Sequence, residues 1–236
     1  VPNGSPYWRD KREERLQAMI ARVIETGIPL VYLNMVGGQD DQGFDGMSFA
    51  LNPKGELAMQ MPAYDEVIQK LDFKKIDGKW FAEKCILEKI PQQLELDYRT
   101  MVETLKDYVS KTGFKKVLLG LSGGIDSALV AVIAVDALGS ENVRCVMLPS
   151  EYTSKSSLED ASKIAKNLKC TLNNVPISEP QSGVKNVLSD LFKGLDPDTT
   201  EENIQSRLRG LLLMAMSNKF GEMLLTLSLL HILTFR

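Results

Sequence analysis

The chain has 236 residues, 44% of them hydrophobic, which is enough for one or two globular domains with ordinary cores. Its formal net charge of −3 argues against a general binder of nucleic acid or of membrane surfaces, and no stretch predicts a signal peptide or a membrane span. The three cysteines, Cys85, Cys145 and Cys170, are isolated in the sequence, which argues against a structural zinc site and favours a reducing, cytoplasmic compartment.

Residues 1 to 92 predict part of an α/β layer and a connecting segment. Hydrophobic residues recur at helical spacing in the first part, and Gly27 is placed to end that helix. The turn Asn52-Pro53-Lys54-Gly55 indicates a hairpin, whereas residues 66 to 92 are mixed and are expected to connect. In chain order we expect a helix over Asp10 to Thr26, a strand over Pro29 to Val36, a loop over Gly37 to Asp41, and strands over Asp45 to Leu51 and Glu56 to Met61.

Residues 93 to 236 alternate between strand and helix patterns. Such alternation predicts a parallel sheet with helices on both faces, and ligands then bind beyond the carboxyl ends of the strands. Two capping boxes, Ser156-x-x-Glu159 and Thr199-x-x-Glu202, indicate where two helices begin. The expected helices are Leu94 to Lys111, Ala128 to Leu138, Ser156 to Asn167, Gly183 to Leu195 and Thr199 to Phe220, and the expected strands are Lys116 to Leu119, Val143 to Leu148 and Thr171 to Val175.

The run Gly120-Leu121-Ser122-Gly123-Gly124-Ile125-Asp126-Ser127 joins a predicted buried strand to a predicted helix. Such a turn directs backbone N–H groups and a helix N-terminus at one point, which makes an anion site. Its glycines allow a ligand to approach the backbone closely, and its two serines add hydroxyl donors. Asp126 does not suit a simple anion cradle, but a carboxylate beside bound phosphates usually holds the Mg²⁺ that bridges them. The alternative is a tight turn whose serines are incidental.

Two other phosphate motifs do not match this run. No lysine follows the glycines, so it is not a Gly-x-x-x-x-Gly-Lys-Ser/Thr loop, and its glycine spacing differs from Gly-x-Gly-x-x-Gly. The run resembles the pyrophosphate loop of the N-type ATP pyrophosphatases, which cut ATP between its α and β phosphates and adenylate a substrate oxygen. The resemblance implies that Gly120 to Ser127 bind ATP, that Asp126 binds Mg²⁺, and that the adenine lies against Met147 to Ser154. An ordinary strand-end loop is the alternative for that last segment.

Further segments make residues 1 to about 226 resemble the glutamine-dependent NAD⁺ synthetases. Asn3-Gly4-Ser5-Pro6-Tyr7 with Lys11 and Arg15, and Val31 to Asp40 with Phe44-Asp45-Gly46, resemble the late part of the family's nitrilase-like glutaminase domain. Thr199 to Arg209 resemble the start of the helix that binds deamido-NAD⁺. The resemblance implies glutamine binding at Ser5 and Lys11 and deamido-NAD⁺ binding at Asn203.

The same resemblance implies the fold, the reaction and the partners. The fold is α/β: a partial nitrilase-like sandwich over residues 1–92, then an incomplete doubly wound, Rossmann-like ATP pyrophosphatase domain over residues 93–236. In the family reaction the carboxylate of deamido-NAD⁺ attacks the α-phosphate of ATP, pyrophosphate leaves, and ammonia from glutamine displaces AMP. The implied cofactors are ATP and Mg²⁺, and the implied partners are deamido-NAD⁺ and glutamine or ammonia, with no nucleic acid or membrane. The full-length family tends to form homo-oligomers.

Both ends of the chain depart from the family pattern. The catalytic Glu, Lys and Cys of the family's glutaminase precede the position of Val1, so no catalytic residue is assigned. After Thr226 the family continues with a polar Thr-Gly-Asn-Lys-Ser-Glu loop, whereas Leu227 to Arg236 is mostly apolar, which we interpret as a truncated or frame-shifted end rather than a divergent strand. We therefore expect a piece of a longer protein. Two alternatives stay open: an inactive fragment, and another N-type ATP pyrophosphatase such as a GMP or asparagine synthetase.

Overall fold

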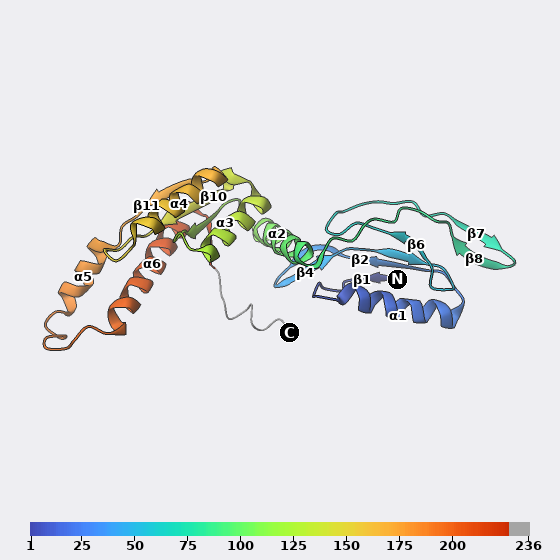
Figure 1. Ribbon diagram of the computed structural model, residues 1–236, viewed down its shortest axis with the longest axis horizontal. Helices are drawn as coiled ribbons and strands as arrows, with labels where there is room; N and C mark the ends of the chain where they lie inside the picture. The colour runs from blue at the N-terminus through green and yellow to red at the C-terminus, as the bar shows by residue number, and fades with distance from the viewer. Residues whose placement is uncertain (227–236) are drawn as a thin grey trace. The chain divides into compact units, whose positions relative to one another are not determined.

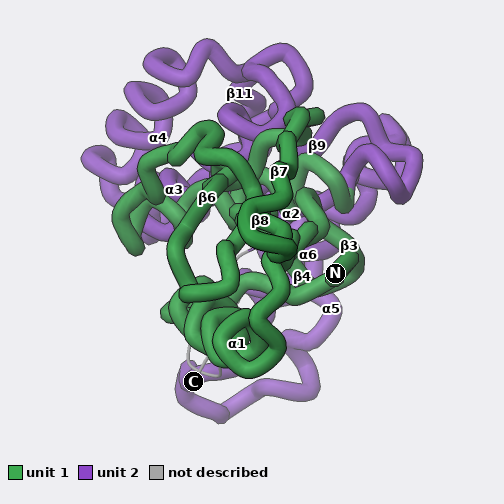
Figure 2. Tube along the Cα trace, turned by 90° about the vertical axis from the view of Figure 1, so that its right-hand side faces the viewer, with its two compact units in different colours: residues 1–108 green, residues 109–236 purple. Residues whose placement is uncertain are grey.

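The computed structural model describes residues 1–226 and divides into two compact units, Val1–Tyr108 and Val109–Arg236 (Figures 1 and 2). Helix α2, Gln93–Lys111, begins where the sequence predicts a new domain and ends just inside the second unit. The domain boundary between residues 92 and 93 stays a prediction. Within residues 1–226, none of the helices has the length and hydropathy that crossing a bilayer requires.

Residues 1–108 contain a sheet in the order β1-β2-β5-β6, with two hairpins, β3–β4 and β7–β8, and helix α1. One face of the sheet packs against α1, where Tyr32 and Phe49 stack with ring centroids 5.0 Å apart. The other face packs Ala50 and Met59 against Ala82, as expected for strands whose side chains alternate between faces. The bounds are β1 Pro2–Asn3, α1 Lys11–Thr26, β2 Leu30–Asn34, β3 Val36–Gln39, β4 Gln42–Asp45, β5 Phe49–Leu51, β6 Leu57–Gln60, β7 Phe73–Ile76 and β8 Lys79–Ala82.

The segment Gly37 to Asp41, expected as a loop, instead forms the end of β3 and the turn of the β3–β4 hairpin. The prediction was wrong because these glycines serve close packing rather than loop flexibility. A Cβ on Gly38 would lie 2.8 Å from the Cα of Thr104 in α2, and the Gly38 N–H donates to Asp107 Oδ2 at 2.7 Å. A Cβ on Gly43 would lie 2.7 Å from Thr100 Cγ2. The backbone of the hairpin therefore packs directly against the helix.

Replacing Gly38 with alanine is expected to destabilise the first unit by about 1–3 kcal/mol, because the new methyl group meets helix backbone that cannot move aside cheaply. Urea unfolding followed by tryptophan fluorescence reports this unit, since both tryptophans, Trp8 and Trp80, lie in it. Gly4→Ala is the matched control, because a Cβ there makes only an ordinary contact, 3.9 Å from Phe44. Equal stability of the two variants would contradict the packing argument.

Residues 66 to 92, expected to connect, contain the hairpin β7–β8. Its turn is Asp77-Gly78, with φ of 49° and 81°. Positive φ at both positions is the conformation of a type I′ turn, and Asp-Gly is a strong sequence signal for it. The prediction missed this signal because the flanking residues are exposed and do not alternate in hydropathy.

In the described part of the second unit, four parallel strands form a sheet in the order β11-β10-β9-β12. This confirms the expected α/β class and its parallel sheet. The strand β9 is buried along its length, with Val117 and Leu118 fully enclosed, as is typical of parallel strands covered on both faces. The bounds are β9 Val117–Gly120, α3 Ile125–Leu138, the 3₁₀ helix Ser140–Asn142, β10 Val143–Met147, α4 Lys155–Leu168, β11 Thr171–Asn174, α5 Ser178–Leu188, α6 Thr199–Phe220 and β12 Met223–Leu225.

The connections of this sheet create a switch point beside β9. Strands β10 and β11 lie on one side of β9 and β12 lies on the other. Helices α3 and α4 pack on β9 to β11, whereas α6 packs on β9 and β12, and right-handed crossovers place these two groups on opposite faces. Ligands of such sheets bind at the carboxyl ends of the strands next to the switch point. The carboxyl end of β9 is where the glycine-rich run begins.

Three details of the predicted helices are wrong. Ser154, not Ser156, caps α4, and its Oγ accepts a hydrogen bond from the Ser157 N–H at 3.1 Å. Asp198, not Thr199, caps α6, in a capping box with Glu201. Both segments contain several cap-forming side chains in a row, so the residue spacing did not identify the correct N-cap residue. Helix α5 begins before Gly183 and ends at Leu188.

The sequence did not predict the strand β12. The expectation for residues 227–236 lies outside the described residues.

Candidate functional site

A pocket of about 420 Å³ lies at the carboxyl ends of β9 and β10 in the second unit. The end of β9 contributes Gly120 and the turn after it contributes Ser122, while the segment after β10 contributes Leu148 and Thr153. Helix α4 contributes Ser157, and α6 forms a further wall. The structure therefore brings the glycine-rich run and the Met147 to Ser154 segment to one cavity, as expected for two parts of one nucleotide site.

Hydrogen bonds within the glycine-rich turn fix its shape. The Ser127 hydroxyl donates to the Gly124 carbonyl at 3.0 Å, and its oxygen accepts from the Ser122 N–H at 3.2 Å. The Ser122 Oγ lies 3.0 Å from the Ser127 Oγ and accepts from the Gly124 N–H at 3.2 Å. Ser122 and Ser127, predicted to add hydroxyl donors, thus also bond the loop to itself, and the loop is preorganised before any ligand binds.

Gly123 holds this turn against helix α4. Its φ is 85°, in the left-handed region that favours glycine, and a Cβ there would lie against the carbonyl oxygen of Ser157 and 3.0 Å from the carbonyl carbon. The sequence suggested that Gly123 makes room for a ligand. The structure shows in addition that a glycine at this position lets the first turn of α4 approach the loop.

The start of α3 directly follows the glycine-rich turn, where the sequence predicts an anion site. Gly124 is the N-cap residue and makes no side-chain cap bond, and the first N–H groups of a helix have no acceptor within the helix itself. Ile125 and Asp126 open the helix at the surface. Within residues 1–226 no three His, Cys, Asp or Glu side chains form a metal-binding group. Asp126 suits a Mg²⁺ ion only as one ligand among phosphate oxygens and water, which is the usual mode for this ion.

Helix α6 brings a cation to the pocket that the sequence did not assign there. Arg209 lines the pocket, and its Nε donates to the Leu148 carbonyl at 3.1 Å. Leu213, one turn later, lies on the same wall. Asn203, the predicted deamido-NAD⁺ contact, is exposed nearer the start of α6 and does not line the pocket; its carbonyl accepts from Arg207 at 3.2 Å. The four-residue spacing of Arg209 and Leu213 was the signal that could have indicated a shared wall.

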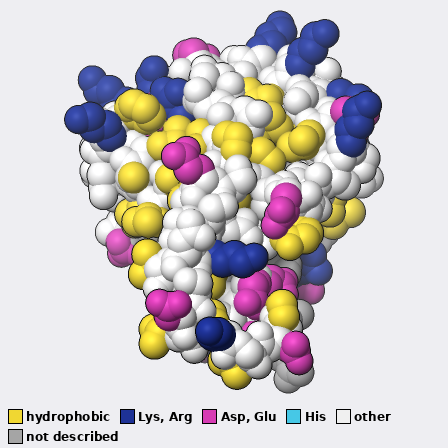
Figure 3. Space-filling model, turned by 90° about the vertical axis from the view of Figure 1, so that its left-hand side faces the viewer, with side chains coloured by type: hydrophobic (Ala, Val, Ile, Leu, Met, Phe, Trp, Pro, Cys, Tyr) yellow, Lys and Arg dark blue, Asp and Glu magenta, His cyan; other side chains and the backbone are white. Residues whose placement is uncertain are grey.

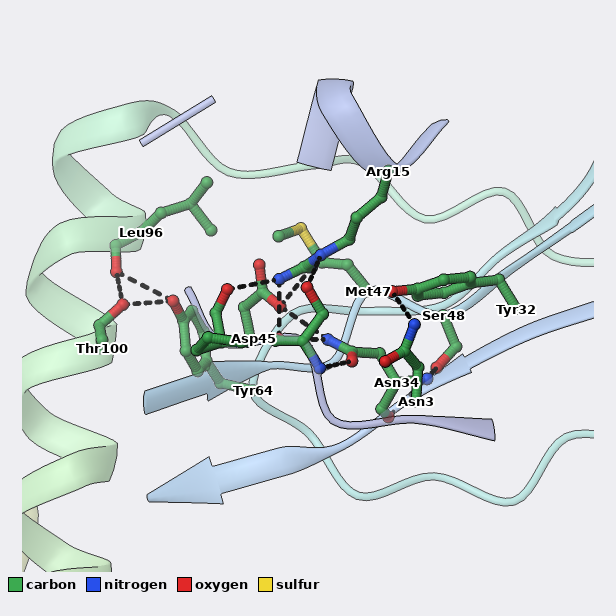
Figure 4. A network of polar contacts seen from close by, with 12 residues as sticks. Asn3, Arg15, Tyr32, Asn34, Asp45, Met47, Ser48, Tyr64, Leu96 and Thr100 are labelled. Carbon is green, nitrogen blue, oxygen red and sulfur yellow. Dashed lines mark hydrogen bonds and ion pairs between the residues drawn. The ribbon is translucent and has the colours of Figure 1, made fainter. Parts of the chain in front are cut away.

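The first unit holds a buried polar network around Arg15 and Asp45 (Figure 4). Arg15 and Asp45 form an ion pair of 2.7 Å whose side chains are 4% and 1% exposed. Arg15 Nε donates to the Ser5 Oγ at 2.9 Å, and Asn34 both accepts from the Ser5 N–H and donates to Asp45. Ser5 is therefore held through its backbone and its side chain. Burial raises the pKa of the Asp45 carboxyl, and the guanidinium of Arg15 opposes that rise.

Lys11 lies at a second pocket, of about 170 Å³, in the first unit. Its Nζ pairs with Glu14 Oε2 at 2.9 Å and lies 3.7 Å from the ring centroid of Trp8. Asp45 also lines this pocket, and its Oδ2 has no hydrogen-bond partner within the described residues. Ser5 does not line it. The structure thus places Lys11 at this pocket, whereas Ser5 is linked to the pocket residue Asp45 through Arg15 and Asn34.

Comparison with known proteins identifies relatives for almost the whole chain. A family model described as NAD synthase matches residues 97–229. The glutamine-dependent NAD(+) synthetase of Rhodobacter capsulatus is 58% identical over 226 residues, which cover 96% of this chain and 41% of that protein.

Two solved structures resemble the fold. The glutamine-dependent NAD⁺ synthetase of Acinetobacter baumannii in complex with ADP matches with a TM-score of 0.88 and 40% identity, over 94% of this chain and 42% of that one. The glutamine-dependent NAD(+) synthetase of Cytophaga hutchinsonii matches with a TM-score of 0.80 over 97% of this chain and 45% of that one, and at 17% identity it supports the fold alone. The chain spans about two fifths of the length of the curated relatives named here.

Proposed function

The chain belongs to the NAD synthase family, and on that premise we propose that its second unit binds ATP with Mg²⁺ and deamido-NAD⁺ for ATP-dependent amidation to NAD⁺. The observation that carries the proposal is the preorganised turn at the carboxyl end of β9, opening onto a pocket shared with the end of β10 and with α6. The relative from Acinetobacter baumannii, which is solved with ADP, supports an adenine nucleotide as the occupant.

The proposed chemistry depends on positioning and on charge. The carboxylate of deamido-NAD⁺ attacks the α-phosphate, the bond to pyrophosphate breaks, and ammonia displaces AMP to leave the amide. The N–H groups at the start of α3 hold phosphate oxygens, and the hydroxyl groups of Ser122 and Ser127 are next to them. Mg²⁺ held by Asp126 and the phosphates would neutralise the leaving pyrophosphate. Asn203, near the start of α6, is the proposed contact for deamido-NAD⁺.

The first unit is proposed to contribute to glutamine binding. Lys11 at the pocket supplies a cation for a carboxylate, and Ser5 is linked through Arg15 to Asp45 of the same pocket. The catalytic step of a glutaminase has no assigned residue in this chain. Ammonia, whether from glutamine or from solution, is the proposed nitrogen donor.

The surface supports assembly into a homo-oligomer. Figure 3 shows hydrophobic side chains among charged ones on the end of the molecule where α5 and α6 lie. Val187 of α5 is 80% exposed and Leu211 of α6 is 63% exposed. Apolar side chains that form a contiguous exposed patch usually mark an interface, and a homo-oligomer is proposed to cover these two. The three cysteines are free thiols, which supports the expected reducing, cytoplasmic compartment.

Asp126→Ala is expected to weaken Mg-ATP binding about tenfold, because one charged metal ligand is lost. Calorimetry with Mg-ATP, and with ATP in the presence of EDTA, measures this, and the EDTA titration should show little difference between wild type and variant. Asp160→Ala is the control, since Asp160 pairs with Lys163 on the surface of α4. A folded wild-type chain that binds no Mg-ATP would contradict the proposal.

Activity tests the remaining alternatives. NAD⁺ formation from deamido-NAD⁺, Mg-ATP and ammonia by this chain would exclude an inactive fragment. Formation of AMP with xanthosine monophosphate or aspartate in place of deamido-NAD⁺ would favour another N-type ATP pyrophosphatase.

A further inference from the structure

We infer that Arg209 is the residue that binds the α-phosphate of the nucleotide, an inference that rests on the proposed binding of ATP. Within the described residues, Arg209 is the one charged side chain that lines the 420 Å³ pocket. The glycine-rich run from Gly120 to Ser127 contains no lysine or arginine, and its single charge is the carboxylate of Asp126. The described lining of the pocket therefore presents one cation to a ligand whose phosphates are all negative.

The anchoring of Arg209 points its guanidinium into the pocket. Nε donates to the Leu148 carbonyl at 3.1 Å, and Nη2 makes a long contact of 3.5 Å with Gln205 Oε1. Among residues 1–226 no carboxylate pairs with Arg209, in contrast to Arg15 and Arg144, which each pair with an acid. A guanidinium has five N–H donors, so the remaining Nη donors are available to an oxyanion. A half-buried arginine with this many unused donors suits phosphate recognition.

The neighbours of Arg209 indicate which phosphate of the nucleotide lies beside it. Leu148, which holds its Nε, belongs to the segment expected beside the adenine. Leu213, one helical turn later, has its Cδ1 3.4 Å from the position of a Cβ on Gly120, where the phosphate run begins. Arg209 thus lies on the wall between the adenine segment and the loop. The α-phosphate joins those two parts of a nucleotide, and it is also the group that the proposed reaction attacks.

This placement gives α6 two tasks in one reaction. Asn203 and Arg209 are six residues apart, which corresponds to about 9 Å along a helix. The helix that carries the proposed deamido-NAD⁺ contact also carries the cation at the electrophilic phosphorus. Charge developing on the α-phosphate oxygens would then be stabilised by a side chain that does not leave with pyrophosphate.

The test compares adenosine, AMP and Mg-ATP binding to the wild-type chain and to Arg209→Gln by calorimetry. Arg209→Gln is expected to weaken AMP binding about tenfold and adenosine binding less than twofold, because a charge-assisted bond to phosphate is lost while the adenine contacts stay. Arg209→Lys should recover part of the AMP affinity. Lys219→Gln is the matched control, since it removes an exposed cation in the last turn of the same helix.

The ratio of AMP to adenosine affinity distinguishes phosphate binding by Arg209 from a purely structural role. Equal weakening of both ligands would mean that Arg209 acts only by holding the Leu148 carbonyl, and the inference would be wrong. Unchanged AMP affinity in a folded variant would also overturn it, while the proposed function would stand if wild type binds Mg-ATP. A wild-type chain that binds none of the three ligands would overturn both.

Discussion

Asp45→Ala is expected to destabilise the first unit by about 3–5 kcal/mol, because it leaves the guanidinium of Arg15 buried and without its partner. The two side chains are 2.7 Å apart and at most 4% exposed, so water cannot replace the lost carboxylate. Urea unfolding followed by the fluorescence of Trp8 and Trp80 measures the change, since both lie in the first unit.

A double replacement serves as the control for this prediction. Burial raises the pKa of Asp45 in spite of Arg15, which indicates that the cost of burying the carboxylate exceeds the gain from pairing it. Arg15→Met with Asp45→Leu should therefore be more stable than Asp45→Ala alone, because no charge is left unpaired. A loss below about 1 kcal/mol in Asp45→Ala would show that the pair is not enclosed as the structure has it.

The raised pKa of Asp45 also determines whether folding stability rises or falls with pH. Because the pKa of Asp45 is higher in the folded chain than in the unfolded chain, the carboxyl group favours folding most at a pH below its unfolded pKa. The stability of wild type relative to Asp45→Asn should therefore fall as the pH rises from that value through the folded pKa, and then stay level. A difference that grows with pH would mean that pairing with Arg15 outweighs burial.

The ion pair could not be found from the sequence, although the motif around it could. Arg15 falls within a helix whose neighbouring residues include Leu16 and Met19, and a charged residue in such a pattern is ordinarily assigned to the surface. Its partner Asp45 is thirty residues away, at the end of β4, and the sequence predicted a strand there but not its partner. Only the fold shows that the two side chains are enclosed together, with Arg15 also bonded to Ser5.

The second unit was predicted more successfully because its signals are local. Buried parallel strands give short apolar runs such as Val117 to Leu119, and the turn that follows is specified by adjacent glycines and serines. Contacts between residues far apart in the sequence could not be predicted in this way. The strand β12 pairs with β9 more than one hundred residues earlier, and Arg209 reaches the pocket only because α6 crosses to the other face of the sheet. Periodicity specifies a helix but not the wall that it forms.

Gly123→Ala is expected to reduce Mg-ATP affinity more than tenfold, because the added methyl group would separate the loop from α4. The residue has a φ of 85°, which costs about 1–2 kcal/mol for a residue with a Cβ, and the methyl group would also meet the carbonyl of Ser157. That carbonyl is helix backbone, so the loop must move instead. Movement would break the bonds among Ser122, Gly124 and Ser127 that hold the N–H groups toward one point.

Gly124→Ala is the control for backbone strain, because it adds a methyl group to the same loop without strain. Gly124 has a φ of −81°, which any residue adopts, and a Cβ there would meet only the Ser122 Oγ, at 3.4 Å. This variant should keep the thermal stability of wild type, whereas Gly123→Ala should lose both stability and affinity. Calorimetry with Mg-ATP and thermal unfolding by circular dichroism measure the two properties. If Gly123→Ala bound Mg-ATP as tightly as wild type, the contact between the loop and α4 would have no part in shaping the phosphate site, and the geometry of the turn would have to come from its serine bonds alone.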